Sequence, residues 1–441
     1  MNEYIFYSHN RTIILDHFLI ISECIDGVSI VIASLLMNAF SVVALLKDCS
    51  KKNDLCQGIK LHGSILEAGL LEKSPYVASS LISMYAKCGE LAKARDVFNK
   101  LPFQTVISWT VLIAGYIEHG HDEDALECFK QIELRGLSPD ALTFVCGLKA
   151  CGIIQDAGKG QQIYNKIAGE GIFENEIGSA LVDMFSKCGL LSKSQDVFDH
   201  LPCHDVVSWT SLISSYVQHG LVDKALTCFE LMKFEGVNPD AVTYVCTLRA
   251  CMLNGAIEKG REIHDEIVKS GLETNDIVAN TLIDVYAKWG LMDEAQEVFE
   301  RLSMRNVISW TVLIAGYVQH GRNRSALELF NQLWSHGIKP NDVTFASILK
   351  ACSNISSFFC GKLIHSYIIE SEIELDEFLG VSLINLYVKC RSLVDARRIF
   401  DRLPNHNVVC WSTMLAAYSQ NGYGDEVLGL YKDMLQSSRP N

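Results

Sequence analysis

The chain has 441 residues, of which 49% are hydrophobic and 20% are charged, and its formal net charge at pH 7 is −14. This composition is typical of folded proteins and excludes a disordered chain, and the length exceeds what a single hydrophobic core usually supports. The acidic charge argues against a surface that is basic all over, although lysines confined to one groove are compatible with nucleic-acid binding.

Residues 1–38 do not match the pattern that fills the rest of the chain. Four carboxylates make this segment unlike the Arg-rich, acid-poor presequences that direct proteins into organelles, so import cannot be inferred from it. Residues 27–46 carry no charge and are long enough to cross a membrane, but serine and asparagine dilute the run and its second half belongs to the first repeat. We therefore predict a buried first helix pair and no membrane span.

From residue 39 onward, a block of about 100 residues recurs. Its clearest marker is a tryptophan that stands at the same place in each copy: Trp109, Trp209, Trp310 and Trp411. Two further markers keep the same spacing, a cysteine that ends an LKAC-like motif (Cys49, Cys151, Cys251, Cys352) and an aromatic residue that opens a YAKCG-like motif (Tyr85, Phe185, Tyr286, Tyr387). Self-similarity at a fixed period is typical of a solenoid, in which each unit buries its apolar face against its neighbours.

Each block contains three predicted helix pairs, of which residues 206–240 form the clearest. Leu212 and Tyr216 fall on one face of a first helix, and Gly220 ends it where a left-handed residue costs least. A second helix follows, on which the small side chain of Ala225 allows the two helices to approach closely. The pattern therefore predicts helical hairpins joined by short turns.

The repeating part divides into twelve units whose lengths cycle through about 35, 35 and 31 residues. The units are 39–74, 75–105, 106–140, 141–174, 175–205, 206–240, 241–275, 276–306, 307–341, 342–376, 377–407 and 408–441. They lack the W-x₂-L-G-x₂-Y signature of tetratricopeptide units. We predict an all-α fold, an α-solenoid (right-handed superhelix) of tandem helix-turn-helix repeats similar in architecture to a tetratricopeptide array, with residues 1–38 outside it.

The repeated strings resemble those of plant pentatricopeptide repeat proteins, in the subclass that alternates long, short and standard motifs (PLS). The strings SWTSLISSYVQHG, GREIHDEIVKSGL and TLIDVYAKWGLMDEAQEVFERL carry the resemblance, which covers residues 39–441. It implies that the chain binds single-stranded RNA, with two or three side chains of each unit reading one base.

In such proteins the residue after the tryptophan, or its equivalent, reads a base together with the last residue of the unit. Asp accepts hydrogen bonds from the donor edge of guanine, whereas Asn both donates and accepts, as adenine or a pyrimidine requires. The pairs implied here are Thr110 with Asp140, Thr210 with Asp240 and, more weakly, Ser179 with Asp205 for guanine, Asn280 with Asn306 for a pyrimidine, and Thr311 with Asn341 for adenine. The longer units have Val or Ala instead, so units 106–341 resemble a reader of 5′-G-n-G-G-n-Y-A-3′.

Two further sets of residues match positions that face RNA in this family. The resemblance implies that apolar residues near the helix start sandwich bases, with ordinary helix packing as the alternative; they are Ile107, Val207, Ile308 and Val409. It also implies that a row of lysines approaches phosphates: Lys87, Lys187, Lys288 and Lys389. A solvated helix end that favours a positive charge is the alternative for the lysines. Glu118 stands at the lysine position of a Trp-marked unit and would repel phosphate.

Catalytic and metal-binding patterns are weak. His264-Asp265-Glu266 matches half of a zinc deaminase motif, but the required CxxC is missing, and His62 and His365 share the register of His264. We therefore interpret these histidines as structural, and the His-Gly motifs at 119, 219 and 320 as helix ends. Most of the sixteen cysteines also lie in register and are expected to be small buried side chains rather than disulfides. We expect no catalytic residue, metal or cofactor.

The sequence thus predicts a monomeric, sequence-selective adaptor that binds single-stranded RNA in organellar RNA processing. The subclass resemblance favours site recognition for C-to-U editing in a mitochondrion or, alternatively, a chloroplast. Because the chain ends at 439–441 without an extension domain, we expect either that a partner supplies the deaminase in trans or that the sequence is truncated. A protein-binding helical scaffold, which the acidic charge would suit, and a factor for RNA stability or splicing are the alternatives.

Overall fold

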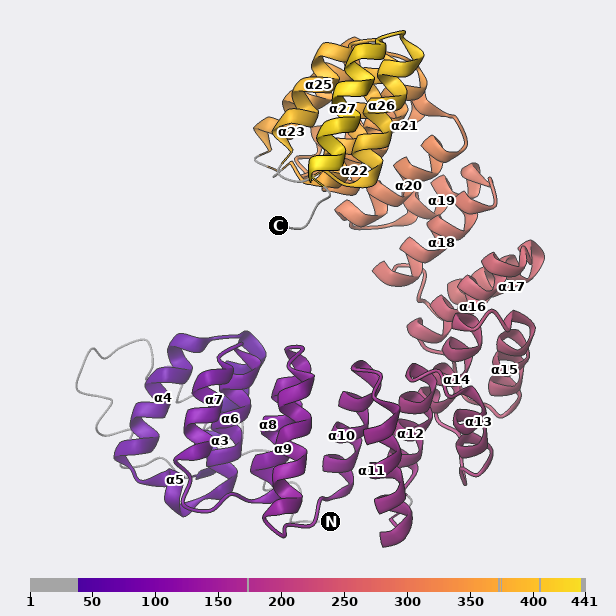
Figure 1. Cartoon of the computed structure of the whole chain (residues 1–441). Helices are drawn as coiled ribbons and strands as arrows, with labels where there is room; N and C mark the ends of the chain where they lie inside the picture. The colour runs from indigo at the N-terminus through magenta and orange to yellow at the C-terminus, as the bar shows by residue number, and fades with distance from the viewer. Residues whose placement is uncertain (1–38, 173, 372, 374, 404–405, 438–441) are drawn as a thin grey trace. The chain divides into compact units, whose positions relative to one another are not determined.

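The computed structural model describes residues 39–172, 174–371, 373, 375–403 and 406–437. Residues 27–38 of the uncharged run lie outside this part. All regular elements of the described residues are α-helices, α3 to α27 (Figure 1). Contacts divide the chain into two compact bodies, Met1–Ser215 and Tyr216–Asn441, with the boundary inside α14 (Val206–Gln218).

The helices of the first body run from α3 to α13. They are α3 (Ala39–Lys52), α4 (Leu55–Glu67), α5 (Leu70–Lys73), α6 (Pro75–Lys87), α7 (Leu91–Asn99), α8 (Val106–Glu118), α9 (Asp122–Leu134), α10 (Ala141–Ile153), α11 (Ala157–Glu170), α12 (Asn175–Lys187) and α13 (Leu191–Asp199). The first helix of each hairpin contacts its own second helix and the first helix of the next hairpin, as in α6 against α7 and α8.

The helices of the second body run from α15 to α27 and repeat the same arrangement. They are α15 (Val222–Phe234), α16 (Ala241–Asn254), α17 (Ile257–Lys269), α18 (Asp276–Lys288), α19 (Met292–Arg301), α20 (Val307–Gln319), α21 (Asn323–Ser335), α22 (Asp342–Asn354), α23 (Phe358–Glu370), α24 (Glu377–Lys389), α25 (Leu393–Arg402), α26 (Val408–Gln420) and α27 (Gly424–Ser437). Within each body the predicted array of stacked helical hairpins is confirmed.

In the units that carry it, the tryptophan marker packs against the preceding unit. Trp109 is almost fully buried and meets the ring of Phe98, from the preceding hairpin, edge-on at 4.4 Å between centroids. The equivalent Trp310 meets Phe299 at 4.7 Å. Because aromatic pairs prefer this edge-to-face geometry, the same two residue types fix the spacing of successive hairpins.

The cysteine marker is packed in the core, as expected. The fifteen cysteines of the described residues are free thiols. Burial raises the pKa of Cys151 to about 12 and that of Cys352 to about 12. A thiol that is protonated and buried in this way behaves as a small apolar side chain.

Glycine allows the closest approach between hairpins in one recurring place. Gly260 of α17 packs against the ring of Trp289, which follows α18, and a Cβ at this position would overlap the ring. Gly160 of α11 is packed in the same way against Met184 of α12. A side chain at either glycine would push the neighbouring helix away, which explains the residue type here.

Candidate nucleic-acid interface

The residue that closes each unit caps the first helix of the next. Asp140 precedes α10, and its Oδ1 accepts hydrogen bonds from the backbone N–H of Thr143 at 2.8 Å and from the Thr143 hydroxyl at 2.5 Å. Asn341 precedes α22 and accepts the same two bonds from Thr344, at 2.9 and 2.7 Å. Because the first turn of a helix has unpaired N–H groups, these bonds stabilise the helix start.

The capping bonds use Oδ1 of the closing residue and leave its other polar group free, an oxygen in Asp and a nitrogen in Asn. The Oδ1 of Asn341 is occupied by the cap, and its Nδ2 has no hydrogen-bond partner among the described residues. The Oδ2 of Asp140 likewise has none in this part of the chain. Asn341 therefore presents only donors, and Asp140 presents an acceptor. The cap thus determines which hydrogen-bonding group of the closing residue remains available at each position.

The threonine of each predicted pair lies beside this cap. The hydroxyl of Thr110 is 2.6 Å from that of Thr143, which in turn donates to Asp140. Thr311 repeats this contact with Thr344 at 2.6 Å and lies 3.5 Å from Oδ1 of Asn341. The structure therefore brings both predicted pairs together. Thr110 and Thr311 are only 3% and 6% exposed, so their hydroxyls mainly position the cap.

The remaining predicted pairs differ in their contacts. Ser179 donates directly to the Asp205 carboxylate, at 3.0 Å from each oxygen. Asn306 caps α20, whereas the Oδ1 of Asn280 is buried without a hydrogen-bond partner in the described structure, and no direct bond joins these two residues. For the last pair, Thr210 lies in α14 of the first body and Asp240 caps α16 of the second.

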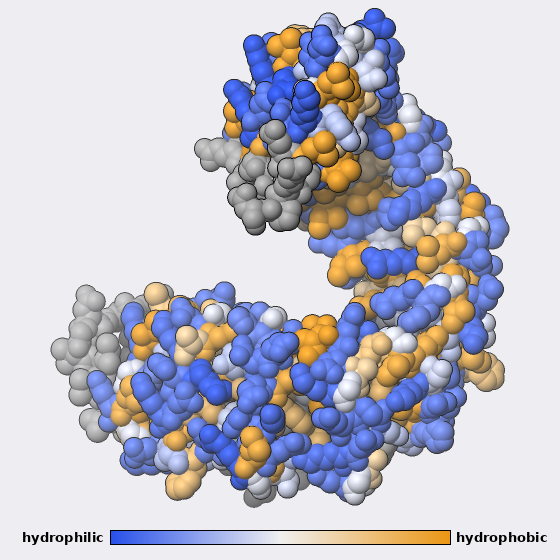
Figure 2. Space-filling model, in the orientation of Figure 1, coloured by the Kyte–Doolittle hydropathy of each residue, from blue (hydrophilic) through white to orange (hydrophobic). Residues whose placement is uncertain are grey.

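The predicted base-sandwiching residues are about half exposed. Ile107, Val207, Ile308 and Val409 are between 48% and 56% exposed, so helix packing covers only about half of each side chain. Seven further units have an exposed apolar side chain at the same second position, which the sequence analysis did not single out: Phe40, Tyr76, Leu142, Val242, Ile277, Val343 and Phe378. Figure 2 shows hydrophobic side chains exposed among hydrophilic ones on one face of the molecule. The one remaining unit, 175–205, has Glu176 at this position instead.

The four predicted phosphate-facing lysines are exposed and end the first helices of their units. Lys87, Lys187, Lys288 and Lys389 are the last residues of α6, α12, α18 and α24. Lys187 forms an ion pair with Asp183 at 2.7 Å, and Lys288 forms one with Asp284 at 3.3 Å. A lysine at a helix C-terminus is favoured by the helix dipole, so the position is compatible with both interpretations given above.

The histidines in the register of His264 have a structural role. Nδ1 of His264 lies 2.8 Å from the hydroxyl of Tyr286 in the next unit, and His62 and His365 make the same contact with Tyr85 and Tyr387. Burial lowers the pKa of His264 and raises that of Tyr286 to about 12, so both partners are uncharged at neutral pH. In the described residues, His, Cys, Asp and Glu side chains form no cluster that could hold a metal.

The His-Gly motifs also link neighbouring units. Nε2 of His119 lies 2.6 Å from the carbonyl oxygen of Ala86 in the last turn of α6, and His320 makes the same contact with Ala287 of α18. The same carbonyl oxygens also accept backbone N–H groups, from Gly89 and Gly290, so each histidine adds a second contact at the end of the helix. None of the helices in the described part of the chain has the length and apolar character needed to cross a membrane.

Two sequence models match the chain in tandem. The model described as the PPR repeat family matches residues 104–152, 204–253 and 305–354, and the model described as the PPR repeat matches 76–102, 242–272, 277–307, 381–408 and 409–438. These matches cover more than half of the chain and consist of helical repeats. They agree with the prediction that the chain is not an enzyme.

Similar proteins are found among plant pentatricopeptide repeat-containing proteins. A chloroplastic protein of Arabidopsis thaliana is 34% identical over 405 residues, which are 91% of this chain and 50% of the relative. A mitochondrial one is 33% identical over 380 residues, 86% of this chain and 37% of the relative. The chain therefore spans about half or less of the length of these relatives.

The fold is similar to a solved structure. The crystal structure of the pentatricopeptide repeat protein PPR10 in complex with an 18-nucleotide psaJ RNA element superposes with a TM-score of 0.68 at 17% identity, and the match covers 92% of this chain and 64% of PPR10. At this identity the likeness shows the solenoid fold alone. Together with the tandem sequence matches, it establishes that the chain belongs to the pentatricopeptide (PPR) repeat family.

Proposed function

We propose that this chain is an adaptor that binds single-stranded RNA in a sequence-selective manner. The proposal rests on the recurrence of two features. An exposed apolar side chain lies near the start of the first helix of a unit, and the Asp or Asn that caps the next helix keeps one polar group free of hydrogen bonds. Apolar side chains can stack against bases, and the free group can hydrogen-bond to a base edge. The RNA in the PPR10 complex supports the proposal by similarity of fold.

The predicted pairs supply the proposed sequence preference. Asp140 and Asp240 present carboxylates to the donor edge of guanine, and Asn341 presents amide protons to adenine. With Asn280 and Asn306 opposite a pyrimidine, units 106–341 bind 5′-G-n-G-G-n-Y-A-3′. The apolar second residues sandwich the bases, and the lysines that end the first helices approach the phosphates.

The cellular role is proposed from the relatives. They are chloroplastic or mitochondrial proteins, so we place this chain in a plant organelle, with the mitochondrion first and the chloroplast as the alternative. The alternation of unit lengths favours the PLS subclass and recognition of C-to-U editing sites. In this role the chain binds as a monomer, and a deaminase-bearing partner in trans supplies the chemistry.

A binding selection on randomised RNA with the full chain tests the RNA-binding function. We expect guanine opposite units 106–140 and 206–240, a pyrimidine opposite unit 276–306 and adenine opposite unit 307–341. Recovery of RNA without any base preference would contradict the proposal. Sequencing of organellar transcripts from plants that lack the protein tests the editing role, because a site that remains C only in those plants identifies the target.

A protein-binding scaffold is the second candidate, favoured by the net charge of −14. Acidic surfaces repel RNA phosphates and attract basic partners. This candidate predicts that exchanging the Asp and Asn caps leaves ligand choice unchanged, whereas RNA binding predicts a change of one base. The selection repeated with the Asn341→Asp variant therefore separates the two functions.

A further inference from the structure

Unit 175–205 lacks the apolar second residue that eleven other units expose. Its second residue is Glu176, an exposed side chain in the first turn of α12 that forms no ion pair within the described residues. If RNA follows the row of second residues, this carboxylate lies where neighbouring units place an apolar contact for a base. Like charge repels the phosphates, and a base that covers the carboxylate must remove its water.

The two predicted base-reading residues of this unit are hydrogen-bonded to each other and to the backbone. Ser179 lies 3.0 Å from both oxygens of Asp205, and Oδ1 of Asp205 also accepts the backbone N–H of Ser208 at 2.7 Å. In unit 106–140, by contrast, both bonds reach the same oxygen of Asp140 and leave the other oxygen unpaired. Asp205 therefore has less capacity to accept a hydrogen bond from a base.

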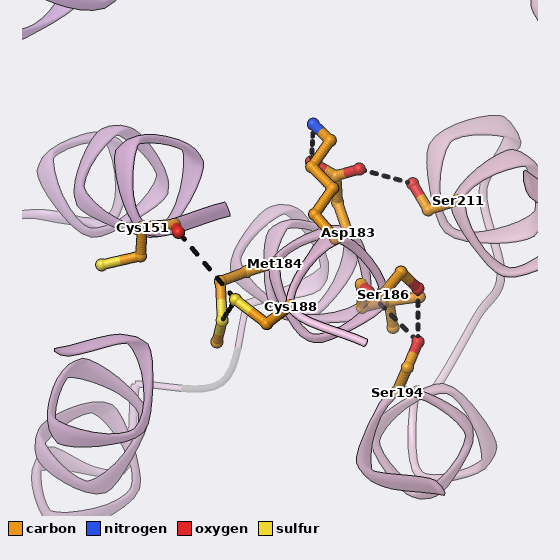
Figure 3. Close-up of polar contacts among 9 residues, drawn as sticks. Cys151, Asp183, Met184, Ser186, Cys188, Ser194 and Ser211 are labelled. Atoms are coloured by element: carbon orange, nitrogen blue, oxygen red, sulfur yellow. Dashed lines mark hydrogen bonds and ion pairs between the residues drawn. The ribbon is translucent and has the colours of Figure 1, made fainter. Parts of the chain in front are cut away.

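The predicted phosphate-facing lysine of this unit also forms an ion pair within the protein. Nζ of Lys187 lies 2.7 Å from Oδ2 of Asp183, whose Oδ1 accepts a hydrogen bond from Ser211 of α14 at 3.2 Å. Figure 3 shows Asp183 directed toward Ser211, beside the contacts of Cys188 and Ser186 with neighbouring helices. An aspartate held in place by Ser211 remains next to Lys187 and reduces the attraction of this lysine for phosphate.

We infer that unit 175–205 is a spacer that neither holds nor selects a base, and that Glu176 is the main determinant of this property. The inference rests on the proposed RNA-binding function and refines its sequence: the RNA is recognised as 5′-G-n-n-G-n-Y-A-3′, in two blocks on either side of one unselected nucleotide. All three features of the unit act in the same direction, although each belongs to a different part of the proposed interface.

Unit 276–306 provides a matched control within the chain, because it has the same length. Its second residue is Ile277, which is exposed. Its lysine, Lys288, is 3.3 Å from Asp284, a longer ion pair than that of Lys187. Exchanging the second residues of the two units therefore tests the role of Glu176 at a fixed unit length.

The experiment measures the affinity of the full chain for the RNA that its own selection enriches. We expect Glu176→Ile to tighten binding about fivefold and Ile277→Glu to weaken it about fivefold, since each change adds or removes one apolar contact with a base. Glu176→Gln separates the charge from the apolar contact and is expected to give a smaller gain, which decreases as salt is raised. Thermal unfolding confirms that the exposed substitutions leave the fold intact.

The selection itself gives a second measurement. In the wild type we expect no base preference opposite unit 175–205, and in the triple variant Glu176→Ile, Ser179→Asn, Asp205→Asn, which copies unit 276–306, a preference for pyrimidines. A strong guanine preference in the wild type, or unchanged affinity of Glu176→Ile while Ile277→Glu weakens binding, overturns the spacer alone. A wild type that binds no RNA overturns the proposed function and the inference with it.

Discussion

Residues 106–205 and 307–407 begin with the same helix and then diverge. The eleven residues from Val106 to Tyr116 are identical to those from Val307 to Tyr317, and in both copies the threonine hydroxyl contacts the next unit at 2.6 Å. The first unit of one region closes with Asp140 and that of the other with Asn341. The first helix and its packing are therefore common to both regions, and the two closing residues differ in one terminal atom, an oxygen in Asp140 and a nitrogen in Asn341.

The divergence continues through the rest of the two regions. Tyr164 in the first corresponds to His365 in the second, and Gly189 corresponds to Arg391. The second helices of successive hairpins are joined by an ion pair in the first region and by two stacked aromatic rings at the same positions in the second. Each difference isolates one physical effect against a constant background, so exchanging residues between the regions measures that effect.

The largest effect is expected from the closing residues. Asn341→Asp replaces amide donors by a carboxylate acceptor, and we expect RNA preference to move from adenine to guanine at one position, with Asp140→Asn doing the reverse. A good base contact in DNA complexes contributes about 1–3 kcal/mol of discrimination, so we expect a change of about tenfold or more. The measurement is the affinity for two RNAs that differ at one base.

The control for this exchange is stability. Asp and Asn are equally good N-caps, so neither exchange should lower the free energy of unfolding appreciably, whereas Asn341→Ala should lower it by about 1 kcal/mol. A loss of stability on Asn341→Asp as large as on Asn341→Ala would show that the two caps are not equivalent. Unchanged base preference in a stable variant would contradict the role of these residues in reading.

The second exchange concerns pH. Burial, with Arg402 as a smaller cause, lowers the pKa of His365 below its ordinary value of 6.5. The unfolded chain therefore binds more protons than the folded chain just below pH 6.5, so the stability from this pair is present above that pH and lost as the pH falls through the folded pKa. In the first region the corresponding residue is Tyr164, which meets the ring of Phe185 edge-on.

We expect the double variant His365→Tyr, Tyr387→Phe, which copies Tyr164 and Phe185, to lose less thermal stability between pH 7.5 and 5.5 than the wild type. The two other His–Tyr pairs remain, so the dependence should decrease without disappearing. Melting temperatures of both proteins across this range provide the measurement. Identical pH profiles would show that the pKa of His365 is the same in the folded and the unfolded chain.

The repeat period was sufficient to predict the helix pairs, because each unit carries its own apolar faces and glycine stops. Capping by Asp140 and Asn341 was not predicted, although the threonine three residues after each of them is a signal that could have indicated it. The contact between His365 and Tyr387 was not, because it joins two helices whose relative rotation depends on packing. The acid at Glu176 became informative only when the exposure of its eleven counterparts was known.

The third exchange concerns the backbone. Arg391 has a φ of 60°, in the left-handed region, where the other copies of the motif have Gly89, Gly189 and Gly290. A side chain in this conformation costs about 1 kcal/mol or more, partly offset by the greater freedom of glycine in the unfolded chain. We expect Arg391→Gly to raise the free energy of unfolding by about 0.5–1 kcal/mol and Gly189→Arg to lower it, as measured by urea denaturation. Equal stability of all three proteins would contradict the assigned strain.

The smallest effect is expected on the second helices of the hairpins, where an ion pair in the first region corresponds to an aromatic pair in the second. Lys166 pairs with Glu133 at 2.8 Å in the first region, and Trp334 stacks on Tyr367 at 4.5 Å in the second. Between them, Lys233 and Glu266 form the same ion pair at 2.8 Å with the charges exchanged. The chain therefore uses three chemically different pairs in one place.

If the only requirement at these positions is that the two side chains attract each other, Glu133→Lys should lower the free energy of unfolding by about 0.5 kcal/mol, because it places two partly exposed lysines side by side. Adding Lys166→Glu copies the arrangement of Lys233 and Glu266 and should restore the loss. The difference between the single and double variants should shrink in 1 M NaCl, since salt screens exposed charges. A double variant as unstable as the single one would mean that the surroundings of Glu133, and not the pair itself, set the charge at this place.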